Sequence, residues 1–166
     1  MRWLIDGYNV IRNDADLRGR EEESLEAGRR ALLHLLAQSA RTSGDDFVVV
    51  FDGARVTGPG PSAGRVQVLF SRPPRTADDE LMRLARQQGA GAVVVTSDRK
   101  VRDAARRAGA AVVTSEQFLR RASEGPEDPA TKIEEDELPR DKRGNPHRLS
   151  KEARAARRAL RRLRPS

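Results

Sequence analysis

Val48-Val49-Val50-Phe51-Asp52-Gly53 is the stretch that decides the fold class, because an unbroken apolar run rich in β-branched residues stops there at a carboxylate and a glycine. Such a run predicts a strand that is buried on both faces, as strands of parallel sheets are. Residues 65–70 instead alternate like an edge strand with one exposed face. Together, the apolar and alternating segments predict strands at residues 2–5, 47–51, 65–70, 92–96 and 110–113.

Helical patterns lie between these segments. The resulting order, β-α-β-β-α-β-α-β-α, predicts an α/β three-layer sandwich with a largely parallel central sheet. Gly89 and Gly109 follow two of the helical patterns, as glycines that end helices do. The expected helices span about 22–41, 77–88 and 98–108, with a short one after Ser115.

Four carboxylates stand where the chain leaves a buried run or opens a helix. In an open α/β sheet the carboxyl ends of parallel strands share one edge, so residues far apart in sequence can converge there. Such a cluster repels itself unless a cation binds, and Mg²⁺ and Mn²⁺ prefer oxygen ligands. We therefore expect metal-dependent phosphate chemistry at Asp6, Asp52, Asp78 and Asp98.

Two neighbouring acids at the start of the 77–88 helix are expected to differ. Thr76 and Asp79 have the spacing of a capping box, which explains Asp79 without any chemistry. Asp78 shares the apolar stripe of Leu81, so it should point inward. Asp98 also aligns with an inward stripe, which favours a site role, although Asp98 or Ser97 could simply cap that helix. Asp6 and Asp52 on their own could be ordinary turn residues, since both precede glycine.

Composition excludes several classes of protein. The chain has 166 residues and no cysteine, so disulfides and thiolate chemistry are impossible. Its histidines, His34 and His147, lack the spacing of a zinc site or catalytic triad. No phosphate-binding loop or dinucleotide fingerprint follows any strand. No apolar run approaches the ~20 residues of a membrane span, and we expect a soluble, cytoplasmic protein.

Charge is distributed unevenly. The chain carries +7, but residues 140–166 hold 11 Lys and Arg against two acids, so the remainder is net −2. We expect a domain at 1–123, an acidic linker at 124–146 and an Arg-rich helix at 147–166. Such a helix favours contact with a nucleic-acid backbone over mere solubility, and it lacks the bulky apolar face of a membrane helix. The arginines expected to contact RNA or DNA are Arg154, Arg157, Arg158, Arg161 and Arg162.

The chain resembles the NYN-domain, YacP-like ribonucleases of the PIN superfamily. The resemblance spans residues 1 to about 120. It implies a Rossmann-like PIN fold and metal-dependent endonucleolytic cleavage of RNA that leaves a 5′-phosphate. The order and spacing of four stretches carry it: Leu4-Ile5-Asp6-Gly7-Tyr8-Asn9-Val10-Ile11, Val49-Val50-Phe51-Asp52-Gly53, Thr76-Ala77-Asp78 and Thr96-Ser97-Asp98.

Carried over residue by residue, the resemblance implies that Asp6, Asp78 and Asp98 hold Mg²⁺ or Mn²⁺. Asp52 would orient a metal-bound water and Asn9 the scissile phosphate. Met82 stands where relatives often place a further acid, which leaves one metal ion or two open. Beside these residues, Tyr8, Arg99 and Lys100 are candidates for RNA contact.

Two other functions compete with this interpretation. A catalytically inactive PIN-fold module would tether RNA without cleaving it. A phosphatase of the haloacid dehalogenase type also starts with a strand-end Asp, but it needs a second Asp where this chain has Tyr8. Which RNA is cleaved, whether cleavage takes place on the ribosome, and the oligomeric state are open at this stage.

Overall fold

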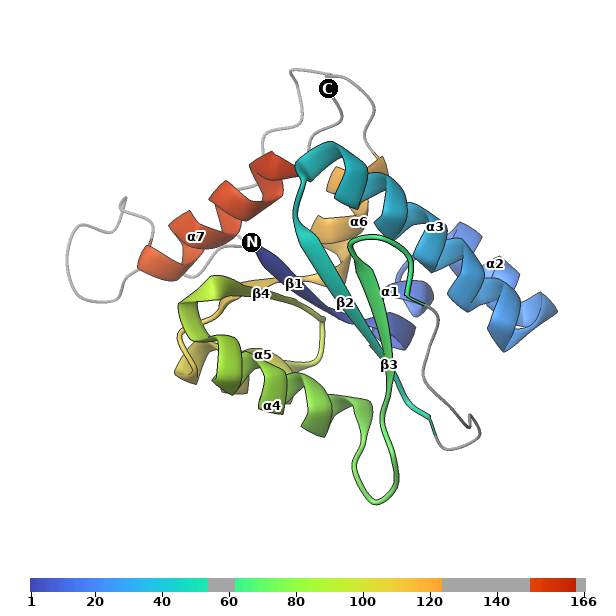
Figure 1. Ribbon diagram of the computed structural model, residues 1–166, viewed down its shortest axis with the longest axis horizontal. Coiled ribbons are helices and arrows are strands. Elements are labelled where there is room, and N and C mark those ends of the chain that lie inside the picture. Colours follow the sequence, from blue (N-terminus) through green and yellow to red (C-terminus); the bar gives the residue numbers. More distant parts are fainter. Residues whose placement is uncertain (54–61, 124–149, 164–166) are drawn as a thin grey trace.

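The fold is built around a five-stranded sheet in which every neighbouring pair of strands is parallel, in the order β3-β2-β1-β4-β5 (Figure 1). The computed structural model describes residues 1–53, 62–123 and 150–163. As its alternating pattern predicted, β3 lies at one edge. The strands are β1 (Arg2–Asp6), β2 (Asp46–Phe51), β3 (Val66–Phe70), β4 (Ala92–Val95) and β5 (Ala111–Val113).

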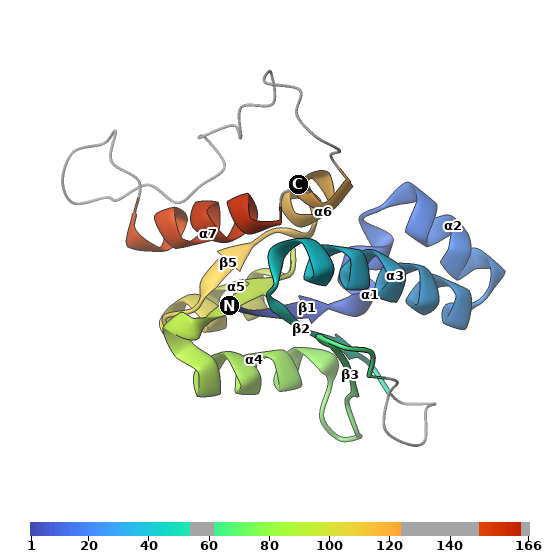
Figure 2. The same cartoon turned by 45° about the horizontal axis from the view of Figure 1, so that its top comes forward.

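Helices cover both faces of the sheet, which confirms the predicted α/β sandwich (Figure 2). α4 and α5 pack on one face, while α1, α3, α6 and α7 pack on the other, with α2 beside α3. In the ranges that the structure describes, no helix is both long and apolar enough to span a membrane. The helices are α1 (Gly7–Arg12), α2 (Ala15–Glu23), α3 (Leu25–Ser43), α4 (Ala77–Gln88), the 3₁₀ turn η1 (Gly89–Gly91), α5 (Arg99–Arg107), α6 (Ser115–Ser123) and α7 (Lys151–Arg162).

The alternation of β1 decides which layer each of its side chains faces. Trp3 and Ile5 belong to the apolar cluster beneath α3 and α7, whereas Leu4 belongs to the cluster beneath α4 and α5. Because successive side chains of a strand point to opposite faces, Asp6 follows Leu4 toward the α4 and α5 layer. The last residue of β1 thus places a carboxylate at the edge of the sheet where α4 and α5 begin.

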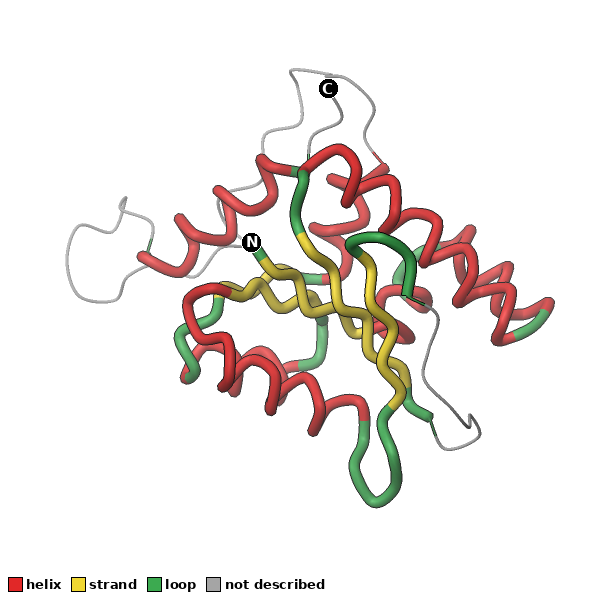
Figure 3. The backbone as a smooth tube through the Cα atoms, in the orientation of Figure 1, coloured by secondary structure: helices red, strands yellow, loops and turns green. Residues whose placement is uncertain are grey.

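The sequence did not predict α1 and α2 (Figure 3). α1 begins directly after β1 because Asp6 caps it, accepting a hydrogen bond from the amide of Asn9 at 3.3 Å. The helix expected at 22–41 is divided at Ser24, which ends α2 and caps α3. The expected linker at 124–146 and most of the Gly- and Pro-rich sequence that follows Asp52 lie outside the described residues.

α7, which lies within the Arg-rich helix expected at residues 147–166, packs against β5 and closes the apolar cluster on the α3 side. Small residues at a helical spacing let the backbone of α7 approach the sheet closely. The buried stripe consists of Ala153, Ala156, Ala159, Leu160 and Leu163. The arginines therefore occupy only the remaining faces of α7, so the Arg-rich helix is part of the domain's core.

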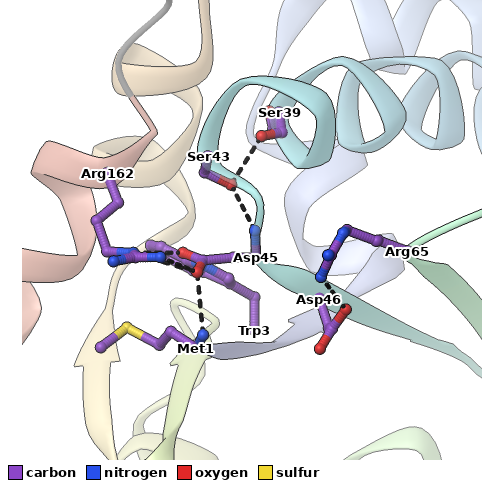
Figure 4. Close-up of polar contacts among 8 residues, drawn as sticks. All are labelled: Met1, Trp3, Ser39, Ser43, Asp45, Asp46, Arg65 and Arg162. Carbon is purple, nitrogen blue, oxygen red and sulfur yellow. Dashed lines mark hydrogen bonds and ion pairs between the residues drawn. The ribbon is translucent and has the colours of Figure 1, made fainter.

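A buried carboxylate anchors α7. Asp45, with no exposed side-chain area, accepts hydrogen bonds from Arg162 Nη2 at 2.6 Å and Nε at 3.0 Å, from the Met1 ammonium at 3.0 Å and from Trp3 Nε1 at 3.2 Å (Figure 4). Burial alone would raise the pKa of Asp45, but these donors outweigh it and hold the pKa below its usual value. The guanidinium of Arg162, one of the side chains expected to bind RNA, is thus paired with a carboxylate of the protein itself.

Candidate functional site

Asp6 is the most buried acid of the site, with 7% of its surface exposed. Both of its hydrogen bonds come from neutral donors: the amide of Asn9 and the hydroxyl of Thr96, the latter at 2.9 Å. Burial, together with the charges of Asp78 and Asp98, raises the pKa of Asp6 to about 6 despite these bonds. The surroundings of Asp6 therefore disfavour its ionised form.

Thr96 joins two of the acids. Its hydroxyl donates to Asp6 and accepts from the amide of Asp98 at 3.1 Å. Asp98 in turn caps α5, since its Oδ1 accepts from the amide of Val101 at 3.0 Å. The capping alternative for Asp98 is thus observed, and the same residue also lies within the electrostatic reach of Asp6.

Asp78 and Asp79 differ as the helix pattern predicted. Asp79 completes a capping box with Thr76, whose amide donates to it at 3.0 Å. Asp78 instead has a raised pKa, first because of burial and then because of the charge of Asp98, while Lys100 acts in the opposite direction. Asp78 therefore faces the other acids of the site.

Asp52 lies at the exposed rim of the same edge. Its Oδ1 accepts from Ser71 Oγ at 3.0 Å, and its charge contributes to the raised pKa of Asp78. The charges of Asp98 and Asp52 thus both act on Asp78. Within residues 1–53, 62–123 and 150–163, however, no three acidic or histidine side chains form a group that could hold one metal ion between them.

Asn9 fixes the loops around the site. Its side-chain oxygen accepts hydrogen bonds from the amide of Ser97 at 2.8 Å and from Ser115 Oγ at 2.6 Å. These bonds join α1 to the turns that follow β4 and β5. Asn9 was expected to orient the scissile phosphate. Its side-chain oxygen instead holds these turns in position.

Glu116 is an acid at this edge that the sequence reasoning missed. It accepts a hydrogen bond from Ser97 Oγ at 2.7 Å. Loss of hydration alone would raise the pKa of Glu116, but hydrogen bonds from backbone and hydroxyl groups and the charge of Arg102 hold it below its usual value. A signal was available, because Thr114-Ser115-Glu116 after β5 repeats the pattern of Thr96-Ser97-Asp98 after β4.

The residues expected to bind RNA fall into two groups. Tyr8 is half-buried at the edge, Lys100 acts on the charge of Asp78, and Arg99 pairs with Asp103 at 3.8 Å while remaining almost fully exposed. The second group lies on α7, whose packing face is opposite to the layer that Asp6 faces. Of these, Arg162 is bound to Asp45, Arg157 also has interaction partners, and Arg154, Arg158 and Arg161 are exposed.

Comparison with known proteins identifies the family. A protein of Bacillus subtilis (strain 168) named "Uncharacterized protein YacP" is 33% identical over 84 residues, which is 49% of either chain, so the match spans about half of that relative. A crystal structure of Rae1 (YacP) from Bacillus subtilis superposes with a TM-score of 0.64 at 30% identity, covering 74% of this chain and 73% of that one. A single-residue variant of that protein gives the same TM-score at 28% identity, covering 73% and 74% of the two chains. The family model of the YacP-like NYN domain matches residues 3–162, α7 included, and the chain therefore belongs to the YacP-like NYN domain family.

Proposed function

We propose that the chain is an endoribonuclease that hydrolyses RNA phosphodiester bonds with the help of Mg²⁺ or Mn²⁺ held by Asp6, Asp78 and Asp98. The observation that carries the proposal is the burial of Asp6 in the field of the other two acids. Membership of the YacP-like NYN domain family and the PIN-like fold support a nuclease-like, RNA-related function. The cation, the hydrolytic step and RNA as the substrate belong to the proposal.

The donor chemistry of the site fits a hard cation. Carboxylate oxygens are the ligands that Mg²⁺ and Mn²⁺ prefer, and the hydrogen bonds to Asp6 leave its negative charge uncompensated. A bound cation would favour the ionised form that burial disfavours. Mg²⁺ usually keeps several waters and is bound through one or two carboxylates, so it does not require the preassembled three-acid group that the described residues lack.

Each residue of the site has a distinct role in this proposal. The cation, when bound, supplies an activated water and neutralises charge on the phosphate. Thr96 holds Asp6 in place, and Asp98 is held in turn by its cap on α5. Asp52 orients the attacking water from the rim. Asn9 fixes the loop ends around the scissile phosphate. In the reaction the oxygen of the water forms a bond to phosphorus while the bond to the 3′ oxygen breaks. The products are a 5′-phosphate and a 3′-hydroxyl, which takes up a proton.

A cleavage assay on a mixture of RNAs tests the proposal, with Mg²⁺ or Mn²⁺ added to chelator-treated protein. We expect cleavage only with the cation, and none from the Asp78→Asn variant. Asp79→Asn is the matched control, because Asp79 serves the capping box of the same helix turn. It should lower the melting temperature and retain cleavage.

Two results would overturn the proposal. Cleavage by Asp78→Asn at the wild-type rate would remove the metal assignment of that residue. RNA binding by the wild-type chain without cleavage in any of the cations would favour the tethering module, in which this fold holds RNA but does not hydrolyse it.

A further inference from the structure

Three aromatic rings line the carboxyl edge of the sheet on the side opposite to the acids. Tyr8 of α1 meets Phe51 edge to face, with 5.1 Å between ring centroids, and Phe51 stacks on Phe70 at 5.9 Å. Phe51 and Phe70 end β2 and β3, and Tyr8 stands two residues after Asp6. The rings therefore form a band that begins beside the buried acid and runs toward the β3 edge.

Two guanidinium groups lie over this band. Arg29 of α3 donates from Nη1 to the Tyr8 hydroxyl at 3.1 Å, and its guanidinium carbon lies 5.6 Å from the centroid of the Phe70 ring. Arg12 of α1 stands over the Tyr8 ring at 5.8 Å. Aromatic faces hold guanidinium groups in this way without neutralising them. We call Tyr8, Phe70, Arg12 and Arg29 the arginine–aromatic patch.

The charge of the patch is uncompensated. In the part of the chain that the structure describes, neither Arg12 nor Arg29 has a carboxylate within ion-pair distance, whereas Arg30, next to Arg29 on α3, pairs with Glu26 at 2.9 Å. Arginine forks match the geometry of phosphate, and exposed ring faces stack on nucleobases. Positive charge beside an aromatic surface, at the edge that carries the acids, fits a nucleic-acid strand better than a protein surface.

We infer that the arginine–aromatic patch binds the single-stranded RNA segment that adjoins the scissile phosphate. The inference rests on the proposed function, and it adds the path of the substrate: from the acids on the α4 and α5 side, past Gly7 and Tyr8, to Arg29 on the α3 side. Arg12 and Arg29 hold backbone phosphates, and the Tyr8 and Arg12 pair offers a stacking surface to one base. A single strand is required because the bases of a duplex are not available for stacking.

Binding of a short fluorescent single-stranded RNA, followed by anisotropy in the Asp78→Asn background so that it is not cleaved, tests the inference. Each phosphate contact contributes about 0.7 to the slope of log K against log salt, so Arg12→Gln with Arg29→Gln should lower the slope by about 1.4. Affinity at about 0.1 M salt should then fall about 25-fold, with the difference vanishing toward about 1 M. Arg30→Gln is the matched control and should leave affinity unchanged, since its guanidinium is paired with Glu26.

Cleavage by the same arginine variants with Asp78 intact gives an independent readout. The KM for RNA should rise with little change in kcat, because the patch attaches the strand and the acids act on the phosphate. The melting temperature shows whether each variant is folded. Wild-type affinity and KM in the folded double variant would overturn the inference while the proposed function stands. A wild-type chain that neither binds nor cleaves RNA would overturn the proposed function itself.

Discussion

The hydroxyl of Thr96 donates to Oδ2 of Asp6 at 2.9 Å, across 90 residues of sequence and between two adjacent strands. Both residues are buried, and the same hydroxyl accepts the amide of Asp98. Its proton is therefore directed at Asp6 and its lone pair at the backbone of a second acid. A single side chain thus orients Asp6 and also favours its ionised form against the effect of burial.

Replacing Thr96 by Val keeps the shape of the side chain and removes this hydrogen bond. The bond lowers the pKa of Asp6, so its loss should raise that pKa above its value of about 6. If Asp6 acts in its ionised form, the acidic limb of the pH–rate profile should move to higher pH. Thr96→Ser restores the donor and should restore the position of the limb. If Thr96→Val leaves the limb unmoved, the ionisation that the limb reports does not belong to Asp6.

The raised pKa of Asp6 also predicts how stability depends on pH in metal-free protein. Between about 3.8 and 6 the unfolded chain has lost this proton while the folded chain retains it, so the free energy of unfolding falls as pH rises. The contribution is about 3 kcal/mol, and it is complete once both states are ionised above about pH 7. Asp6→Asn should therefore be more stable than the wild type at pH 7 and lose this advantage near pH 4.

Chelator-treated protein and urea titrations at several pH values measure this difference. Added Mg²⁺ or Mn²⁺ should stabilise the wild type more as pH rises, because a cation binds the ionised carboxylate. A wild-type and Asp6→Asn pair whose stability difference does not change between about pH 4 and 7 would contradict the assignment.

Much of this site could be predicted from the sequence, because its strands and helix starts depend on short-range sequence patterns. Continuous apolar runs specify β1, β2 and β4, the topology of a parallel sheet brings their ends together, and the capping box separates Asp78 from Asp79. The inward orientation of Asp78 could be predicted from the helical period alone. These features depend on neighbours a few residues apart and on one topological rule.

What the sequence did not reveal depends on partners far away in the chain. The docking of α7 needs a buried Asp45, 117 residues before Arg162, and a run of arginines hides the alanine stripe that packs. Tyr8 stood out on its own, but Arg29 reaches it from another helix, 21 residues later. α1 was missed because Asp6-Gly7 has the composition of a turn, and only the packed structure shows Asp6 as a cap.

Gly7 is required by close packing. A Cβ there would lie 2.3 Å from Phe51 Cε1, so Gly7→Ala must displace the ring that Tyr8 contacts. We expect a loss of about 1–3 kcal/mol and weaker RNA binding through the disturbed patch. Gly19→Ala in α2 has open space around its Cβ and should be neutral or slightly stabilising. Equal melting temperatures for the two variants would show that Phe51 yields without cost.

Arg162 should matter for stability rather than for RNA. Arg162→Gln removes a bidentate donor from a fully buried carboxylate and should cost about 3 kcal/mol, the low end for a broken buried pair because the guanidinium itself is half exposed. Thermal unfolding of Arg162→Gln and of Arg161→Gln, its exposed neighbour, gives the comparison. A similar melting temperature for both would mean that the Met1 ammonium and Trp3 suffice to hold Asp45 and α7.

The exposed arginines of α7 separate RNA attachment from folding. Deleting the helix would uncover the apolar cluster and remove Arg162 from Asp45, so a truncated chain should unfold and cannot report on RNA. Replacing Arg154, Arg158 and Arg161 by Gln leaves the buried stripe and the ion pair unchanged. If these side chains contact a single strand, the slope of log K against log salt should fall by about 2 at constant melting temperature.

This change should add to the loss caused by the arginine–aromatic patch, because the two surfaces belong to different elements and share no residues. A variant carrying all five substitutions should lose about 3.5 from the slope. An unchanged slope in the α7 variant, with a lowered slope in the patch variant, would limit the RNA path to the edge that holds the acids. In that case the exposed face of α7 would serve another purpose, and the helix would contribute to catalysis only by completing the core beneath the sheet.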